Sequence, residues 1–340
     1  MTAPALSRGL GWARARRISP AAWVVVGVVA VWLVATNLPL AVIGLLIGCI
    51  YALGAVGMTL IFGNLRFANI AHGDYMTLGA YFALWVQASV IPGVGTHGSV
   101  WIFTFAWPIL LALPAAMLVV GVIAVAVDLV VFKRMRRRGA ASVAMALASL
   151  GVAISLRGVV QIVWGTQPER YERISKKFFI LLGDIRVPPD LLFVAAAALL
   201  ITGLVYLLLA RTKLGKAMRA TADNPDLARG SGIDTERVNA WTWLIGVGLA
   251  AAAGVLLALV QAQLLPFLGW KVLIPIFAAV VVGGIGSPYG ALVGGLLIGL
   301  TAEVSTTFDW LNPSYKPAVA FAVLVVVLLV RPRGIFGSGS

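Results

Sequence analysis

Long apolar segments separated by short polar ones fill most of the sequence. A helix rises about 1.5 Å per residue, so it needs about 20 apolar residues to cross a bilayer. Ten segments approach that length: 20–37, 39–62, 69–90, 101–131, 140–165, 190–210, 238–262, 272–286, 289–305 and 317–331. A transmembrane β-barrel would instead show short segments of alternating polarity. The pattern therefore predicts an all-α, polytopic membrane protein with about ten transmembrane segments.

One polar interruption, GGIGSPYG at 283–290, has two interpretations. It is either a turn between two full spans or a break within a re-entrant element. Irregular backbone occurs at membrane depth only where it is buried in protein or lines a cavity. The second interpretation makes this stretch a candidate for lining a translocation path, through Gly283, Gly284, Gly286, Ser287 and Pro288.

Small residues recur at a spacing of four in several of the apolar segments. The stretch GLLIG occurs twice, at 44–48 and at 295–299, and each copy places two glycines one helical turn apart. Such glycines let helix backbones approach closely in lipid. The spacing predicts close helix packing, and five apolar letters are too few to indicate an internal repeat.

Composition supports the membrane class and excludes two others. Hydrophobic residues make up 61% of the chain and charged residues 11%, whereas soluble domains carry about 25% charged residues. A single soluble core stops growing at about 250–300 residues, so a soluble 340-residue domain of this composition is excluded. The net charge of +14 lies at the ends of apolar segments, as membrane orientation requires, so nucleic acid is not an expected partner.

The distribution of basic residues predicts the orientation. With the N-terminus in the cytoplasm, the inner segments hold 18 of the 26 lysines and arginines, including the run KRMRRR at 133–138. Basic residues favour the cytoplasmic side. We therefore expect a basic cytoplasmic N-terminus at 1–19, a membrane domain at 20–331 with an inner polar segment at 211–237, and a cytoplasmic tail at 332–340. The mixed-charge outer loop 166–189 is either a docking site for a soluble partner or a solvated connection.

The chain shows no catalytic machinery of its own. A phosphate-binding loop needs G-x-x-x-x-G-K-[ST], and Gly215–Lys216 is followed by Ala217. Two histidines and one cysteine, far apart in the sequence, do not form a metal set. We therefore expect a non-enzymatic transport subunit without a cofactor or metal of its own. Energy for transport would come from another chain.

Ionisable residues are scarce within the predicted spans. Coupled carriers usually hold such residues deep in the membrane. Arg157 is the exception, and counting from the inner end of its span places it near the outer surface, where its side chain can reach water. The alternative role for Arg157 is contact with a substrate carboxylate.

A polar stretch, RATADNPDLARGSGID at 219–234, separates two long apolar segments. Asn224, Pro225 and Asp226 are a favourable helix start, because they supply a cap, a preset φ angle and a negative charge at the positive end of the dipole. Gly230 and Gly232 are natural helix stops. A helix of about two turns is unstable alone, so the pattern favours a docking element over a plain connecting loop.

A second polar group lies at the start of the predicted span at 69–90. Asn69, His72 and Gly73 are expected at its cytoplasmic entry. Asn69 can cap the helix, and His72 can bond to a backbone carbonyl. A structural role of this kind and a role in gating both remain open.

Three blocks of the sequence together resemble the permeases of branched-chain amino acid ABC transporters. They are ATADNPDLARGSGIDTERV (220–238), YALGAVGMTLIFGNLRFANIAHGDYMTLGAY (51–81) and the stretch from Ala253 to Val304, which carries an AG, P, GGIGS and GA-x-x-GG pattern. The resemblance covers most of residues 40–335 and is closer to LivH-like than to LivM-like members. An N-terminal extension of about forty residues with an added span departs from the family pattern.

The resemblance implies a membrane subunit of an ATP-driven importer in the bacterial inner membrane. Its partners would be two ATP-binding subunits, which bind ATP and Mg²⁺, a second permease subunit and a soluble or tethered solute-binding protein. The residues that would contact the ATP-binding subunit are Asn224, Pro225, Asp226, Leu227, Ala228, Gly232 and Ile233.

The implied substrates are branched-chain and other hydrophobic amino acids. Related permeases carry urea, short amides or aromatic acids, so other small organic solutes are an alternative. A stand-alone channel or ion-coupled carrier would need intramembrane charges or a polar pore ring, and an integral-membrane enzyme would need clustered catalytic side chains. The sequence favours neither of these.

Overall fold

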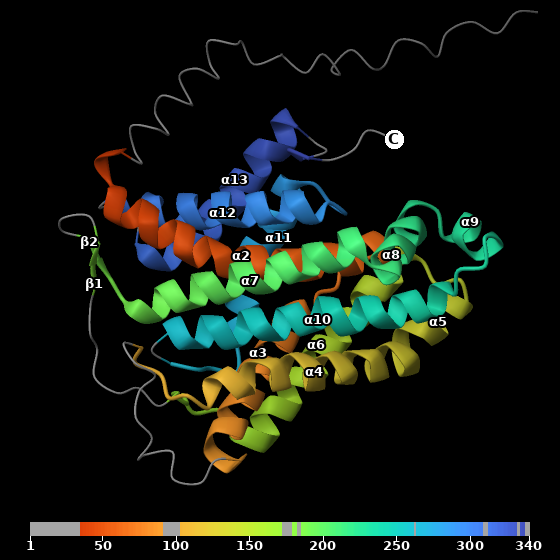
Figure 1. The fold of residues 1–340 in the computed structure, drawn as a ribbon, viewed down its shortest axis with the longest axis horizontal. Helices are drawn as coiled ribbons and strands as arrows, with labels where there is room; N and C mark the ends of the chain where they lie inside the picture. The colour runs from red at the N-terminus through yellow and green to blue at the C-terminus, as the bar shows by residue number, and fades with distance from the viewer. Residues whose placement is uncertain are drawn as a thin grey trace, which may run out of the picture.

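The structure is a computed structural model that describes residues 35–90, 103–171, 179–181, 185–261, 263–308, 312–331 and 334–336. Within these ranges the chain is almost wholly helical (Figure 1). The predicted basic N-terminus at 1–19, most of the predicted span at 20–37 and most of the tail at 332–340 lie outside the described residues.

The helices follow one another with short connections. They are α2 (Leu38–Leu65), α3 (His72–Trp85), α4 (Ile109–Val127), α5 (Lys133–Arg137), α6 (Ser142–Trp164), α7 (Pro189–Arg211), α8 (Lys213–Asp223), α9 (Pro225–Gly230), α10 (Thr235–Val260), α11 (Leu268–Gly283), α12 (Pro288–Val304) and α13 (Lys316–Val330). The π-helical segments Val86–Val90 and Asp128–Phe132 continue α3 and join α4 to α5, and 3₁₀ segments are found at Ser305–Thr307 and Pro313–Tyr315. Two short strands, β1 (Phe179–Leu181) and β2 (Ile185–Val187), pair antiparallel.

Seven helical segments in the described part are long and apolar enough to cross a membrane. They are Leu38–Leu65, Ile109–Arg137, Ser142–Trp164, Pro189–Arg211, Thr235–Val260, Pro288–Thr307 and Pro313–Val330. The predicted spans at 69–90 and 272–286 correspond to the shorter helices α3 and α11. The chain is thus a helical, multi-pass membrane protein, and its described part contains fewer full-length spans than the ten predicted.

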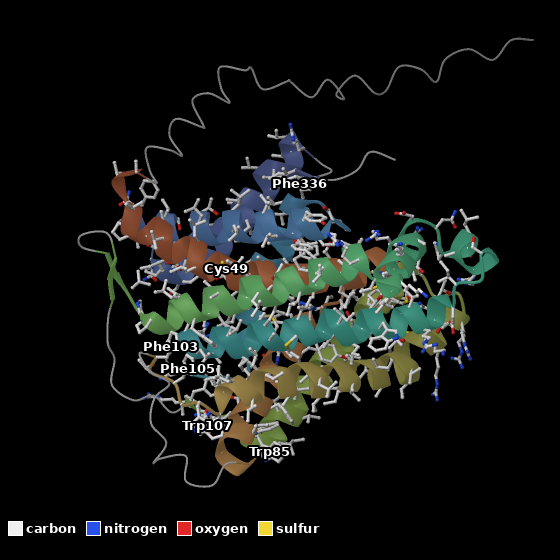
Figure 2. The ribbon with its side chains drawn as sticks, in the orientation of Figure 1. Cys49, Trp85, Phe103, Phe105, Trp107 and Phe336 are labelled. Carbon is white, nitrogen blue, oxygen red and sulfur yellow. The ribbon has the colours of Figure 1, made fainter. Side chains whose placement is uncertain are left out.

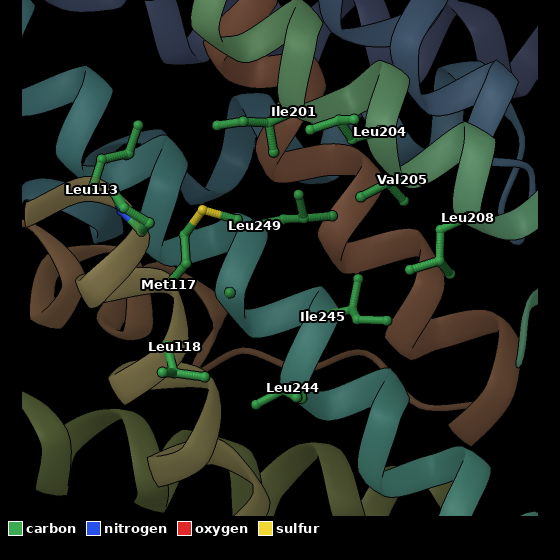
Figure 3. Close-up of a pocket in the computed structure, with 12 residues that line it drawn as sticks. Leu113, Met117, Leu118, Ile201, Leu204, Val205, Leu208, Leu244, Ile245 and Leu249 are labelled. Carbon is green, nitrogen blue, oxygen red and sulfur yellow. The ribbon is translucent and has the colours of Figure 1, made fainter. Parts of the chain in front are cut away.

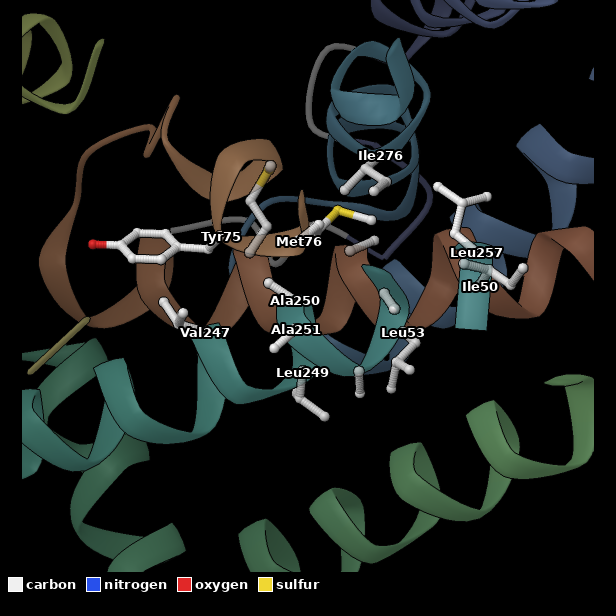
Figure 4. Packing of buried hydrophobic residues seen from close by; sticks show 14 of the residues in the cluster. Ile50, Leu53, Tyr75, Met76, Val247, Leu249, Ala250, Ala251, Leu257 and Ile276 are labelled. Carbon is white, nitrogen blue, oxygen red and sulfur yellow. The ribbon is translucent and has the colours of Figure 1, made fainter. Parts of the chain in front are cut away.

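Burial separates the helices into a centre and a periphery. In the most apolar 18-residue stretch of α10, 83% of the residues are buried, and in that of α2 61% are buried. The corresponding stretches of α6 and of the segment containing α13 are only 28% and 11% buried. Figure 4 shows α10 residues Val247, Ala250 and Ala251 packed near Tyr75 and Met76 of α3. The exposed surfaces of the outer helices are apolar, which suits a hydrocarbon environment.

The two GLLIG stretches pack against each other, one on α2 and one on α12. A Cβ atom added at Gly44 would lie 2.9 Å from the carbonyl oxygen of Gly299, and one at Gly48 would lie 3.0 Å from the Cα of Leu296. No side chain larger than hydrogen fits at this separation without a shift. The predicted role of these glycines in close helix packing is confirmed.

The stretch 283–290 forms a turn between α11 and α12. Gly284 and Gly286 adopt φ angles of 109° and 84°, which favour glycine. The Ser287 hydroxyl then caps α12 by accepting the N–H of Gly290 at 3.1 Å. Both flanking helices run up to the turn, and α11, with 16 residues, is shorter than a full-length span.

The two ends of the molecule differ in their side chains. The basic helix α5 lies at the same end as α8 and α9 (Figure 1). Phe103, Phe105, Trp85 and Trp107 gather at the opposite end (Figure 2). Basic residues on one side and aromatic rings at a membrane boundary are both features of membrane proteins with a fixed orientation.

Candidate functional site

The short helix α9 projects from the basic end of the molecule (Figure 1). The side-chain oxygen of Asn224 accepts the backbone N–H groups of Asp226 at 3.1 Å and Leu227 at 3.0 Å. Pro225 occupies the first helical turn, and Asp226 lies in that turn as well. The predicted helix start is confirmed. Gly232, with a φ angle of 83°, turns the chain after the helix ends.

One face of α9 is anchored and the other is open. Ala228 is only 4% exposed, and Ile233 packs against the main hydrophobic core. Leu227 is 68% exposed although it is a large apolar residue. The contact surface predicted from the sequence therefore divides: Ala228 and Ile233 attach the helix to the body, while Asn224, Asp226 and Leu227 face outward.

Arg66 connects the end of α2 to the segment that leads into α9. Its guanidinium donates to the carbonyl oxygens of Ala222 at 3.3 Å and Asp223 at 3.2 Å, which end α8. Arg66 itself has a φ angle of 56°, the only positive value of a non-glycine residue in the described part. Sequence patterns do not single out Arg66 beyond its place as the one charged residue in the segment 63–68.

The segment after Arg66 is buried rather than looped into solvent. Phe67 is 2% exposed and packs against Phe132 and Trp243, with ring centroids 5.1 and 6.3 Å apart. The Ile70 N–H donates to the Ser149 hydroxyl at 2.9 Å. The Ser149 hydroxyl of α6 thus satisfies a backbone N–H of this segment that would otherwise need water.

His72 joins the start of α3 to the middle of α2, and Asn69 stabilises the turn just before the helix. The Asn69 side-chain oxygen accepts the N–H of Ala71 at 3.1 Å, and the His72 Nε2 atom lies 2.9 Å from the carbonyl oxygen of Gly54. The predicted bond of His72 to a backbone carbonyl is confirmed, whereas Asn69 bonds to the residue before the helix and does not cap α3. Gly54 precedes the end of α2 at Leu65 by eleven residues, about 16 Å along the axis.

The predicted location of this group at the inner end of a full span is therefore wrong. The chain passes back along α2 in non-helical form and starts α3 about halfway along it. Gly73 then lies so close to α11 that an added Cβ would be 2.7 Å from the Gly269 carbonyl oxygen. Asn69, His72 and Gly73 are brought together, while Gly283 to Pro288 lie in the separate α11–α12 turn.

An ion pair follows directly after this group. Arg157 of α6 donates through Nε and Nη2 to the two carboxylate oxygens of Asp74, at 2.9 and 3.1 Å. Its guanidinium also lies over the rings of Phe267 and Trp270, 4.8 and 5.0 Å from their centroids. Asp74 lies in the first turn of α3 and is only 1% exposed, so Arg157 is held by a buried carboxylate as well as by two aromatic rings.

Two cavities differ sharply in their lining. The larger, about 490 Å³ between α4, α7 and α10, is lined by aliphatic side chains such as Leu113, Met117 and Leu249 (Figure 3). The smaller, about 220 Å³, lies beside the C-terminal half of α8. Its lining includes Tyr206 and Tyr289, which stack with centroids 4.6 Å apart. Among the described residues, no group of three or more His, Cys, Asp or Glu is placed to hold a metal ion.

The apolar exterior, the buried non-helical entry into α3 and the outward-facing α9 define a multi-pass membrane protein with a short exposed helix at one end. The family described as "Branched-chain amino acid transport system / permease component" matches residues 40–328. The chain belongs to this family, which is a family of permease subunits and not of enzymes.

Curated relatives match the chain over most of its length. The high-affinity branched-chain amino acid transport system permease protein LivH of Salmonella typhimurium is 30% identical over 86% of this chain and 93% of its own length. BraD of Pseudomonas aeruginosa, a permease protein with the same description, is 30% identical over 86% of this chain and 94% of its own. A probable LivH of Methanocaldococcus jannaschii is 32% identical over 83% and 87%.

Proposed function

We propose that this chain is the membrane-spanning permease subunit of an ATP-driven importer that moves branched-chain and other hydrophobic amino acids across the bacterial inner membrane. The observation that carries the proposal is α9, a capped helix with Leu227 68% exposed at the basic end of the molecule. Relatives that cover most of the chain are named as permeases for branched-chain amino acids.

The proposed assembly surrounds this chain with several partners. Two ATP-binding subunits, which carry ATP and Mg²⁺, dock on α9 and the residues that follow it within the coupling segment 211–237, and Leu227 enters an apolar cleft on one of them. A second permease subunit, identical or different, completes the pore. A soluble or tethered solute-binding protein delivers the amino acid from outside, and the lipid bilayer surrounds the permeases.

The proposed topology has ten crossings and both termini in the cytoplasm. In this arrangement 1–19 is a basic cytoplasmic segment, 20–331 is the permease domain and 332–340 is the tail. The basic residues of α5 and α8 lie at the α9 end, which supports a cytoplasmic location for that end.

The contacts around Arg66 suggest how docking reaches the interior. A movement of α9 is transmitted through the last residues of α8 to Arg66, which holds their carbonyl oxygens. Arg66 is continuous with the buried segment that leads to Asn69, His72 and Gly73. The nucleotide state of the partner would thereby shift the start of α3, because the partner contacts α9 differently in its two states.

The substitution Leu227→Asp tests the docking role. A carboxylate at a 68% exposed position does not disturb the fold, but it places a charge in an apolar cleft of the partner, which is costly. We expect Leu227→Asp to abolish ATP-dependent leucine uptake in membranes while the protein level stays normal.

Thr212→Asp is the matched control. Thr212 is exposed and caps α8 by accepting the N–H of Gly215 at 3.0 Å, a role that aspartate also fills. The Thr212→Asp variant adds the same charge outside α9. We expect its uptake to stay within about twofold of wild type, a smaller change than the tenfold that corresponds to about 1.4 kcal/mol. Normal uptake by Leu227→Asp would contradict the docking assignment.

A further inference from the structure

We propose that Arg157 binds the carboxylate of the amino acid in transit, with Asp74 positioning its guanidinium and the exposed aromatic face of α11 forming the wall of the site. This inference rests on the proposed function and adds to it the residues that bind the carboxylate and the apolar side chain of the solute.

The hydrogen bonding of Arg157 leaves part of its guanidinium open. Arginine carries five N–H donors in a fixed fork. Asp74 takes up Nε and Nη2 and is itself only 1% exposed, whereas the Arg157 side chain is 17% exposed. No protein acceptor bonds to Nη1 within the described ranges of the chain. The carboxylate is enclosed, and the remaining edge of the cation is free for an anionic ligand.

An apolar and aromatic surface extends from this edge along α11. Phe267 and Trp270 lie under the guanidinium. Ile274 and Phe277 follow on the same helical face at spacings of four and three residues. These four side chains are between 38% and 47% exposed, so the face is not covered by any other described part of this chain.

A cavity of about 340 Å³ lies where this face meets Asn69. Ile274 and Phe277 line it together with Asn69 and Phe321. The Asn69 side chain is 3% exposed, and its Nδ2 donor has no hydrogen-bond partner among the described residues. A buried donor without a partner costs stability, and its position beside this cavity supports a polar ligand group at this place.

The dimensions and chemistry fit an amino acid. Trp270 and Ile274 are four residues apart, about 6 Å along the helix axis, so one small molecule can reach from the guanidinium to the cavity. The carboxylate bonds to Nη1 of Arg157. Aromatic faces attract an ammonium group, and the cavity lined by Ile274 and Phe277 accepts a branched aliphatic side chain.

A second, partly buried ion pair shows a different pattern. Lys316 of α13 donates to both carboxylate oxygens of Glu303 on α12 at 2.7 Å. Neither residue lies over an aromatic ring among the described residues or lines one of the cavities described above. This pair joins two helices and serves as the control for effects of removing an ion pair between helices.

The test uses the full complex in liposomes, with its ATP-binding subunits, second permease and binding protein. Arg157→Gln alone leaves Asp74 buried and unpaired, which destabilises a protein. The double variant Asp74→Asn/Arg157→Gln restores a neutral, hydrogen-bonded pair of similar shape. If the pair is only structural, the double variant imports leucine normally. We expect instead at least a tenfold loss of uptake, with assembly and binding-protein-stimulated ATP hydrolysis retained.

Two further variants complete the comparison. Arg157→Lys keeps the charge but loses the fork, and we expect intermediate uptake. Glu303→Gln/Lys316→Met neutralises the control pair, and we expect uptake within about twofold of wild type, since a tenfold change needs 1.4 kcal/mol. Normal uptake by the double variant at Asp74 and Arg157 would overturn the inference. So would a loss in the Glu303 and Lys316 variant as large as that in the double variant.

A labelling experiment tests the site without relying on uptake. In a Cys49→Ala background, the Ile274→Cys variant is treated with a negatively charged and a positively charged methanethiosulfonate reagent. We expect the anionic reagent to react faster, leucine with binding protein to slow it, and Arg157→Gln to remove the preference. If the thiol of the Ile274→Cys variant is unreactive in every nucleotide state, the second permease covers this face and the inference is overturned.

Failure of the proposed function gives a different result. In that case the wild-type complex imports no solute, or no ATP-binding subunit associates with the chain, whatever side chain replaces Arg157. The inference about Arg157 would then fall with the function on which it rests. Leu227→Asp would also show no loss of uptake relative to the wild type.

Discussion

At the scale of single residues, Arg66 has the most consequential geometry. It is the only described non-glycine residue with a positive φ angle, 56°, a conformation that is uncommon for residues with a Cβ atom. Its guanidinium holds the last carbonyl oxygens of α8. A residue that accepts an unfavourable backbone conformation while joining two elements is expected to act in transmission between them.

Arg66→Gly separates the backbone role of Arg66 from its side-chain role. Glycine adopts this φ angle without strain, so the turn persists while two charge-assisted hydrogen bonds are lost, about 1 kcal/mol at an exposed position. We expect leucine uptake per ATP hydrolysed to fall about fivefold, with total protein unchanged. Arg138→Gly, an exposed arginine at the same end, controls for lost charge. An unchanged uptake-to-hydrolysis ratio would rule out the transmission role.

At the scale of helices, the pairing of α2 with α12 is set by glycines. Gly44 and Gly48 face Gly295 and Gly299, and the backbones approach too closely for any Cβ atom between them. In lipid the hydrophobic effect does not drive helices together, so van der Waals contact between backbones supplies much of the association. The same approach places the end of α12 beside α2, where Glu303 bonds to Lys316 of α13.

Gly299→Leu should separate these helices. A leucine there would overlap Gly48 and Gly44, and overpacking costs about 1–3 kcal/mol or more. We expect a lower Tm in detergent and earlier aggregation on size-exclusion chromatography. Gly203→Leu is the matched control, since a Cβ at Gly203 of α7 meets no atom within 4 Å. Equal Tm values for the two variants would contradict a close α2–α12 contact.

At the scale of the whole molecule, the basic and aromatic ends define an orientation (Figure 2). The helices with the least buried surface, α6 and α13, carry large exposed apolar side chains such as Ile162 and Leu329, 86% and 77% exposed. Lipid or a second subunit covers such surfaces in a membrane protein. The centre of the molecule, by contrast, contains α10 and α2, the two segments with the largest buried share among the candidate spans.

Cysteine labelling tests the proposed topology. In a Cys49→Ala background, Ser231→Cys follows α9 and Asn312→Cys lies between α12 and α13. Because α12 separates the two ends, we expect an impermeant thiol reagent to label Asn312→Cys in intact cells. Ser231→Cys should react only after the cells are permeabilised. Labelling of both positions from the same side would show that the orientation of α12 or the crossing number is wrong.

The sequence by itself determined the membrane class, most of the helical segments and the cap of α9. These depend on local physics: apolar length decides whether a segment crosses a bilayer, and Asn224 bonds to N–H groups two and three residues ahead. The family resemblance was equally readable, because it rests on three contiguous blocks.

Only the tertiary structure decided where α3 begins and what Arg157 contacts. Counting residues from a predicted surface assumes that each apolar segment is one continuous helix, and the buried non-helical stretch after Arg66 breaks that assumption. The bonds of His72 to Gly54 and of Arg157 to Asp74 join residues 18 and 83 positions apart. Spacing along the chain carries no information about such contacts, because they depend on how separate helices pack.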